Sequence, residues 1–126
     1  MKFARWVFTI AGIYGVIVVL PQYFMEHRFA QDLPPALTHP EHFYGFIGVT
    51  LAWQFVYLLI GTDPVRYRPV MLIAMLAKLS FGIACFALYL QGRLAPIVLA
   101  ASSVDLFLVI LFGICYWLTS NMERGL

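Results

Sequence analysis

Long apolar stretches alternate with short polar connections along this chain. A helix rises 1.5 Å per residue, so about 20 apolar residues cross the 30 Å hydrocarbon core of a bilayer. Four stretches approach or exceed that length. The pattern predicts an all-α membrane protein, a four-helix transmembrane bundle that forms a single domain over residues 1–126. The expected helices cover about residues 3–20, 41–61, 69–90 and 95–118.

Prolines and glycines mark where these helices are expected to begin and end. Pro21 should end the first helix, because proline cannot continue the backbone hydrogen-bond ladder. Thr38-His39-Pro40-Glu41 has the spacing of a capping box and should begin the second, which Gly61 should terminate as a C-cap. The connection Leu90-Gln91-Gly92-Arg93 is long enough only for a tight turn. The third and fourth helices should therefore be antiparallel neighbours.

Lys78 and Asp105 each interrupt an apolar stretch near its middle. Either residue at the centre of a membrane-spanning helix costs roughly 2.5 to 3.5 kcal/mol, so the two charges need compensation. Lys78 lies nine residues beyond Pro69, about 13 to 14 Å into the membrane. Asp105 lies nine residues beyond Pro96 at the opposite face, which leaves it about 16 Å from the first face. The similar depths predict an intramembrane ion pair.

The second expected helix adds polar residues at the same level. Thr50, Gln54 and Tyr57 recur at helical spacing and share one face. Lys78, Asp105, Gln54 and Tyr57 are therefore the predicted ligand or ion-pair pocket. The pair is interpreted either as a structural device that fixes helix register, or as a proton relay, ion site or ligand contact. The small residues around it indicate either tight helix packing or a lined cavity.

Glycine pairs on the first two helices favour close helix packing. Gly12 with Gly15 and Gly45 with Gly48 are each separated by two residues. Small residues let helix backbones approach one another in a membrane. Both pairs are predicted to be packing positions, with a weaker signal than a full G-x-x-x-G motif.

Composition supports the membrane class and indicates an orientation. The chain is 63% hydrophobic and 11% charged, with a net charge of +2, whereas soluble domains carry charge at about a quarter of their positions. Nothing in this balance indicates nucleic-acid binding.

No A-x-A-like cleavage site follows Leu20, so the first helix is expected to be retained. Because lysine and arginine favour the cytoplasmic side, both termini are predicted to be cytoplasmic. That side would then hold Lys2, Arg5, Arg66, Arg68 and Arg124, and the outer side Arg28 and Arg93.

The connection over residues 21–40 is expected to be the one sizeable outer loop, lying partly in the membrane interface. It and the helix start after it carry His27, His39 and His42, with Glu41 between the last two. Imidazole and carboxylate groups suit zinc, and paired histidines suit haem. The spacing is not a helix-borne H-x-x-x-H, and Glu41 already has a predicted capping role. A solvated or pH-responsive loop is favoured, with the three histidines as weak metal candidates, and no cofactor is assigned.

Enzymatic motifs do not occur in the sequence. There is no nucleophile triad, P-loop or dinucleotide fingerprint. A membrane enzyme acting on a lipid would have His39 and His42 as its candidate bases. We therefore expect a non-enzyme and assign no catalytic residue.

Three segments carry a resemblance to a known family. These are His39-Pro-Glu-His-Phe-Tyr-Gly-Phe through Ala52-Trp-Gln, then Asp63-Pro-Val-Arg-Tyr-Arg-Pro, and Lys78-Leu-Ser-Phe-Gly. Over nearly its whole length the chain resembles an uncharacterised family of small four-helix bacterial membrane proteins. The resemblance implies a bacterial inner-membrane location and no particular activity. In architecture alone the chain is similar to DoxX-like and EXPERA-type proteins, and fold does not determine function.

Two hypotheses of function follow from these observations. In the first, the chain is a non-enzymatic accessory or scaffold subunit of a larger membrane complex, bound through its packed helices. In the second, it is a small transporter or a lipid- or small-molecule-binding protein, as a homodimer, and uses the polar pocket around Lys78 and Asp105. The lipid bilayer is a partner in both.

Overall fold

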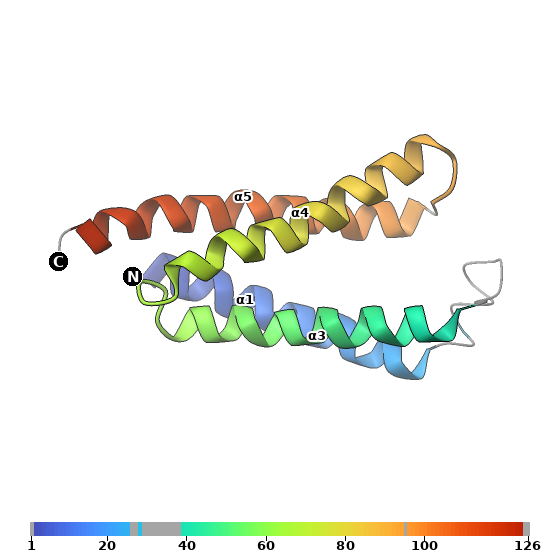
Figure 1. Cartoon of the computed structure of the whole chain (residues 1–126), viewed down its shortest axis with the longest axis horizontal. Coiled ribbons are helices and arrows are strands. Elements are labelled where there is room, and N and C mark those ends of the chain that lie inside the picture. Colours follow the sequence, from blue (N-terminus) through green and yellow to red (C-terminus); the bar gives the residue numbers. More distant parts are fainter. Residues whose placement is uncertain (1, 26–27, 29–38, 95, 125–126) are drawn as a thin grey trace.

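The computed structural model describes residues 2–25, 28, 39–94 and 96–124. In that part of the chain, long α-helices predominate and no strand occurs (Figure 1). The elements are α1 (Lys2–Val19), the 3₁₀ helix η1 (Leu20–Phe24), α3 (Pro40–Thr62), α4 (Arg68–Leu90) and α5 (Pro96–Arg124). Four helices, the first of them extended through η1, are long and apolar enough to cross a membrane. The predicted class, an all-α membrane protein with a four-helix bundle, is confirmed.

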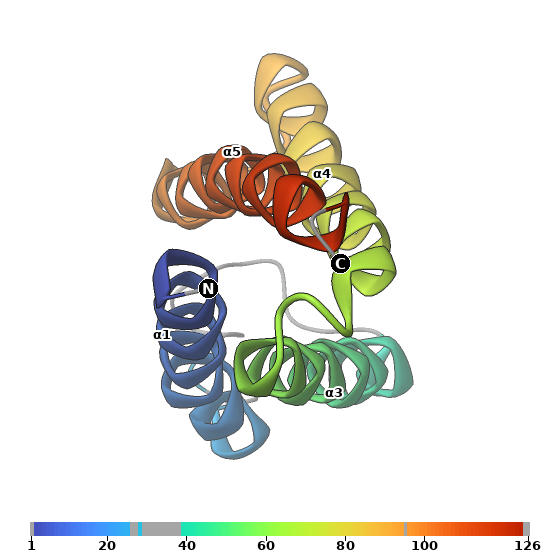
Figure 2. The same ribbon diagram turned by 90° about the vertical axis from the view of Figure 1, so that its left-hand side faces the viewer.

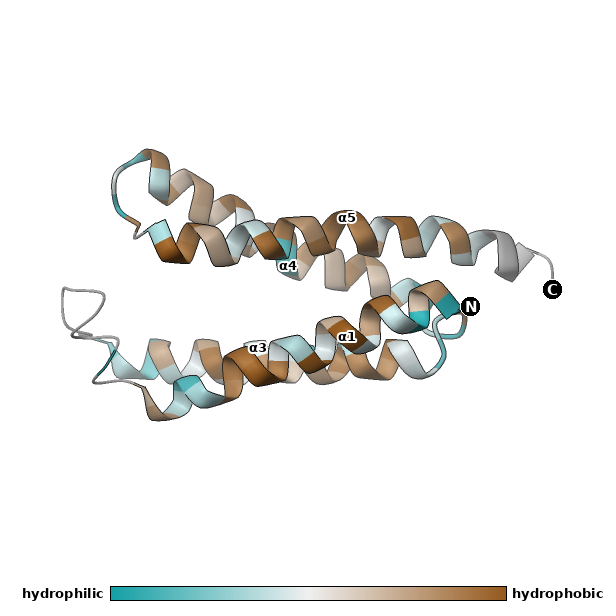
Figure 3. Cartoon of the chain, turned by 180° about the vertical axis from the view of Figure 1, so that it is seen from behind, coloured by the Kyte–Doolittle hydropathy of each residue, from teal (hydrophilic) through white to brown (hydrophobic). Residues whose placement is uncertain are grey.

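The outward surface of the bundle is apolar along most of its length. Large hydrophobic side chains are exposed on every α-helix, among them Trp6, Phe55, Leu76 and Trp117. Hydrophobic colour dominates the middle of the helices in Figure 3, apart from one hydrophilic patch midway along the α4/α5 pair. Monomeric soluble proteins rarely expose apolar surface so extensively. The hydrocarbon of a bilayer is the solvent that fits this surface.

The helices associate as two pairs. α1 packs closely along α3, and α4 along α5, while contacts between the pairs are sparser. At one end, where α1 begins and α3 ends, a buried core joins the pairs, and the Phe8 ring stacks on the Phe112 ring at 4.2 Å. We call this the closed end. At the open end, where α3 begins and α4 ends, the pairs diverge (Figure 1; Figure 2 views the bundle from its closed end). α1 begins and α5 ends at the closed end, so both chain ends lie on one side.

Glycines on α1 and α4 permit the close packing within each pair. A Cβ atom added to Gly12 would lie 2.6 Å from Leu58 Cγ, and one added to Gly82 would lie 2.5 Å from Leu106 Cδ2. Such approaches are closer than van der Waals contact allows, so a larger residue would push the helices apart. At Gly15, the side chain of Gln54 occupies the space that a Cβ atom would need. Gly12 and Gly15 are thus packing positions, as predicted.

Two other glycines behave differently from their predictions. Gly61 does not cap α3, because the helix continues to Thr62, and Asp63 is the C-cap residue. Gly61 instead is buried against Thr9 of α1. Gly45 is not a packing position, since no atom lies within 4 Å of a Cβ added there. Sequence spacing identified small residues but not the neighbour that each one faces.

The helix ends lie within one residue of the predictions for α1, α3 and α4, whereas α5 continues to Arg124, six residues beyond the expected end at residue 118. α1 ends at Val19, and the chain continues as η1 with Pro21 in its first turn, where a missing N–H costs little. The outer loop therefore does not begin at Pro21. His39 is the N-cap of α3 and makes no side-chain capping hydrogen bond. Thr38, the first residue of the expected capping box, lies outside the described residues. The tight turn after Leu90 is confirmed, with Gly92 at a φ of 71°.

Candidate functional site

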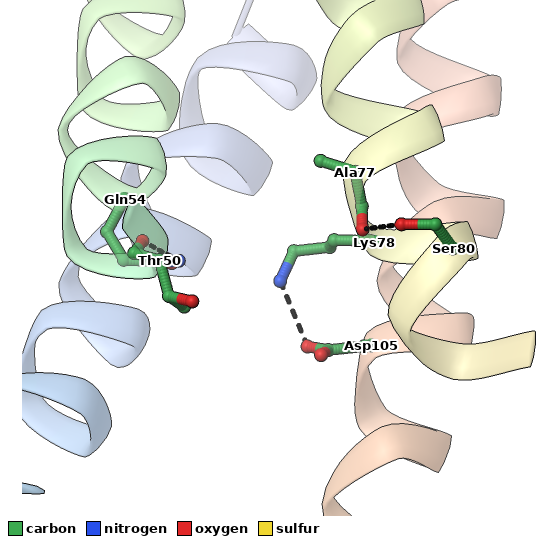
Figure 4. Close-up of polar contacts among 6 residues, drawn as sticks. All are labelled: Thr50, Gln54, Ala77, Lys78, Ser80 and Asp105. Carbon is green, nitrogen blue, oxygen red and sulfur yellow. Dashed lines mark hydrogen bonds and ion pairs between the residues drawn. The ribbon is translucent and has the colours of Figure 1, made fainter. Parts of the chain in front are cut away.

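Lys78 and Asp105 meet across the α4/α5 pair. Lys78 Nζ donates a hydrogen bond of 2.9 Å to Asp105 Oδ1. The Lys78 side chain is 8% exposed and the Asp105 side chain 22%. The two groups point toward one another in Figure 4. Because a short turn joins antiparallel α4 and α5, residues near the middle of the two helices can lie side by side. The contact that the matching depths predicted is therefore present.

An aromatic ring provides the lysine with a second partner. Lys78 Nζ lies 5.1 Å from the centroid of the Tyr57 ring, on α3. Tyr57 is almost fully buried, and its ring lies 5.3 Å from that of Phe112 in the core of the closed end. A cation near an aromatic face is stabilised by about 0.5 to 2 kcal/mol, more when it is desolvated. The ammonium group thus interacts with a carboxylate from α5 and with a π-face from α3.

Gln54 lies at the same level but faces a different helix. Its side chain is directed at Gly15 of α1, and its Nε2 donates a 2.9 Å hydrogen bond to the Thr50 carbonyl oxygen. The amide oxygen is buried and has no hydrogen-bond partner among the described residues. Of the four predicted pocket residues, Lys78 contacts both Asp105 and Tyr57, whereas the hydrogen bond of Gln54 is made to Thr50. All four residues nevertheless line one cavity, between α3 and α4. The Thr50 side chain extends into the gap between α3 and the ion pair (Figure 4).

A cavity of about 610 Å³ lies between the two helix pairs and reaches the ion pair. Val18 and Val19 from α1 and Val98 and Ala101 from α5 contribute to its walls, while Lys78, Asp105, Thr50 and Gln54 are its polar lining at mid-span. The buried core lies between these polar residues and the closed end of the bundle. Mostly apolar walls with a few convergent polar groups are typical of small-molecule sites, and so is this volume.

A second cavity of about 610 Å³ reaches the same ion pair between α3 and α4. Val49 and Trp53 of α3 and Ala77 of α4 line it, and Val49 is exposed on the apolar surface. Phe46 and Phe81 line both cavities, and their ring centroids lie 5.7 Å apart. The first cavity therefore reaches the ion pair from the middle of the bundle, and the second reaches it from the side, between α3 and α4.

Two of the three weak metal candidates come together at the start of α3. One ligand atom from each of His39, Glu41 and His42 lies within 4.8 Å of the others. His39 Nδ1 is 3.3 Å and His42 Nε2 is 3.9 Å from Glu41 Oε1. His27 lies outside the described residues. All three side chains are at least 66% exposed, whereas metal ligands are usually oriented by hydrogen bonds to surrounding groups. The cluster offers donors that suit zinc without a built shell around them.

Comparisons with protein-family models, curated proteins and solved structures found no match to this chain. Its site is therefore interpreted from its own geometry. Sequence reasoning missed Arg28, Phe46 and Phe81, which also line the cavity between the helix pairs. Phenylalanines on apolar helices carry no signal that separates a cavity wall from a lipid-facing position.

Proposed function

We propose that this chain is a membrane protein that binds a lipid or another small molecule in the cavity between its helix pairs. One observation carries this proposal: a cavity of about 610 Å³ that ends on a charged pair at mid-span. Ionisable residues at this depth are costly and commonly mark ligand or ion pathways. If register were the pair's sole role, the helices around it could pack without leaving space.

The accessory or scaffold role stays a prediction. Apolar residues exposed on every α-helix would suit partner helices, but a bilayer covers such a surface equally well. The cavity supports the binding role, since a scaffold does not need one. We further propose that the closed end, with Lys2, Arg5 and Arg66, faces the cytoplasm of a bacterial inner membrane.

Two tryptophan substitutions on neighbouring residues test the proposal. Ala101→Trp fills the cavity, because Ala101 lines it. Ala100→Trp is the matched control, since Ala100 is also exposed on α5 but does not line the cavity. Each variant is purified in mild detergent, and bound molecules are extracted and measured by mass spectrometry. We expect a molecule that co-purifies with the wild type and the control but is depleted at least tenfold from Ala101→Trp.

A different outcome of the purification would contradict the binding role. Stoichiometric recovery of a larger protein complex, with no small molecule dependent on Ala101, would favour the scaffold role. A double variant, Lys78→Met with Asp105→Leu, separates the roles independently. It should fold in either case, but it should lose the co-purifying molecule only if the pair contacts that molecule. Uptake of the co-purifying molecule into liposomes that contain the protein then distinguishes a carrier from a protein that only binds the molecule.

A further inference from the structure

We propose that the ligand is an uncharged amphiphile with a hydroxyl head, such as a monoacylglycerol, whose hydroxyl bridges Lys78 and Asp105. This inference rests on the proposed function and names the chemical class of ligand for the ion pair that both cavities reach. It follows from three features of the site: its charge, its hydrogen-bonding groups and the surface of its walls.

The charges at the ion pair favour an uncharged head, and Arg28, the other charged residue in the lining of the cavity between the helix pairs, already has an interaction of its own. Lys78 and Asp105 neutralise one another at 2.9 Å. A carboxylate head would compete for the ammonium group and leave Asp105 near a second negative charge. A cationic head would compete for Asp105 in the same way and leave Lys78 without its partner. Breaking a buried ion pair is far less favourable than leaving it intact, so a neutral head is accommodated best.

The hydrogen-bonding groups select a head that both donates and accepts. Lys78 Nζ carries three N–H donors, and among the described residues it donates one hydrogen bond, to Asp105 Oδ1. Asp105 Oδ2 accepts none from any described residue. A hydroxyl group placed beside both residues accepts from the ammonium group and donates to the carboxylate. A carboxylate or an ester carbonyl cannot donate, and a quaternary ammonium group can neither donate nor accept.

The walls require an apolar body on that head. Val18, Val19 and Val98 line the cavity between the helix pairs. Val49, which lines the cavity between α3 and α4, is exposed on the bilayer-facing surface. An acyl chain is continuous with the bilayer on this side while its head reaches the ion pair. A free polyol would leave the apolar walls without contacts, so we assign the ligand to the membrane rather than to water.

Quenching of a single tryptophan tests this assignment in lipid nanodiscs. Trp53 lines the cavity between α3 and α4, whereas Trp6 and Trp117 are exposed on the outer surface. A Trp6→Phe and Trp117→Phe variant reports from the cavity, and a Trp53→Phe and Trp117→Phe variant reports from the lipid-facing surface at Trp6. The probe is a monoacylglycerol with a brominated chain. Its comparators carry the same chain on a carboxylate or a trimethylammonium head, and free glycerol is a competitor.

We expect the brominated monoacylglycerol to quench Trp53 saturably and to be displaced by its unbrominated form. Its apparent affinity should exceed that of both charged amphiphiles at least tenfold at pH 8. Quenching of Trp6 should rise without saturation, as for any probe dissolved in the bilayer. Combining Lys78→Met with Asp105→Leu should abolish the preference among heads, with circular dichroism confirming that the helices are retained.

Equal or tighter binding of either charged amphiphile would overturn the inference and leave the proposed function standing. Displacement of the probe by glycerol alone would overturn the assignment to a membrane-derived ligand. If no amphiphile quenches Trp53 saturably, the inference fails; if in addition no molecule depends on Ala101 during purification, the proposed function fails with it.

Discussion

Removing one charge of the Lys78–Asp105 pair should destabilise the bundle far more than removing both. At 2.9 Å and an effective dielectric constant near 20, the Coulomb attraction is about 6 kcal/mol. Lys78→Met leaves an unpaired carboxylate at mid-span and should cost about 3 kcal/mol, and Asp105→Leu should cost a similar amount. The double variant leaves no charge, so its free energy of unfolding should lie within about 1 kcal/mol of the wild type. The coupling energy of the cycle is then about 6 kcal/mol, in agreement with the Coulomb value.

This cycle is measured by unfolding the protein in mild-detergent micelles with increasing dodecyl sulfate and following helicity by circular dichroism. Ser80→Ala combined with Asp105→Leu is the control cycle, because Ser80 lies near the same depth on α4 but is exposed and bonds to Ala77 of its own helix. Its coupling energy should be below about 0.5 kcal/mol. A Lys78–Asp105 coupling below about 1 kcal/mol, as is common for polar contacts in membrane bundles, would refute the estimate of about 6 kcal/mol for the attraction between the two charges.

Three further predictions concern packing, each read as the change in the free energy of unfolding in the same assay. Gly15→Ala should destabilise the protein by about 1 to 3 kcal/mol through collision with Gln54, whereas Gly45→Ala, in open space, should be neutral or stabilising by up to about 1 kcal/mol; equal effects would contradict the assigned contacts. Gln54→Met removes a buried oxygen that has no partner among the described residues and should stabilise by about 1 kcal/mol; a loss above 1 kcal/mol would show that this oxygen has a partner. Phe8→Ala should cost about 3 to 5 kcal/mol, and a loss no larger than that of the exposed Ile13→Ala would argue against a core at the closed end.

The sequence was sufficient for the four spans and for the ion pair. Apolar length determines a membrane span almost alone, because every backbone polar group in hydrocarbon must be bonded within the helix. The contact of Lys78 with Asp105 follows from a tight turn and from the similar mid-membrane depths of the two residues. Both inferences depend on position along a helix, which sequence gives directly.

Rotation about the helix axes and the spread of the helix pairs were not accessible in this way. Gln54 and Tyr57 lie on one helix face, yet the first side chain packs on α1 and the second contacts Lys78. Gly61 and Gly45 were assigned from spacing, and their surroundings were decided by which helix lies opposite. The buried core that joins the pairs, with Phe8 and Phe112, lies at the closed end, and the cavity lies on the other side of the ion pair from it. No local pattern encodes that difference between the two ends.

The central claim, that the two charges meet at mid-span beside the cavity, is tested most directly by solid-state NMR in lipid bilayers. The sequence contains two lysines, Lys2 and Lys78, so a Lys2→Arg variant with ¹⁵N-lysine and ¹³C-aspartate labels isolates the ammonium group of interest. We expect dipolar coupling between Lys78 Nζ and an aspartate Cγ at a separation below about 4 Å, since a charge-assisted hydrogen bond joins the groups, and its loss in Asp105→Asn. An absence of such coupling, or coupling that survives Asp105→Asn, would contradict the account.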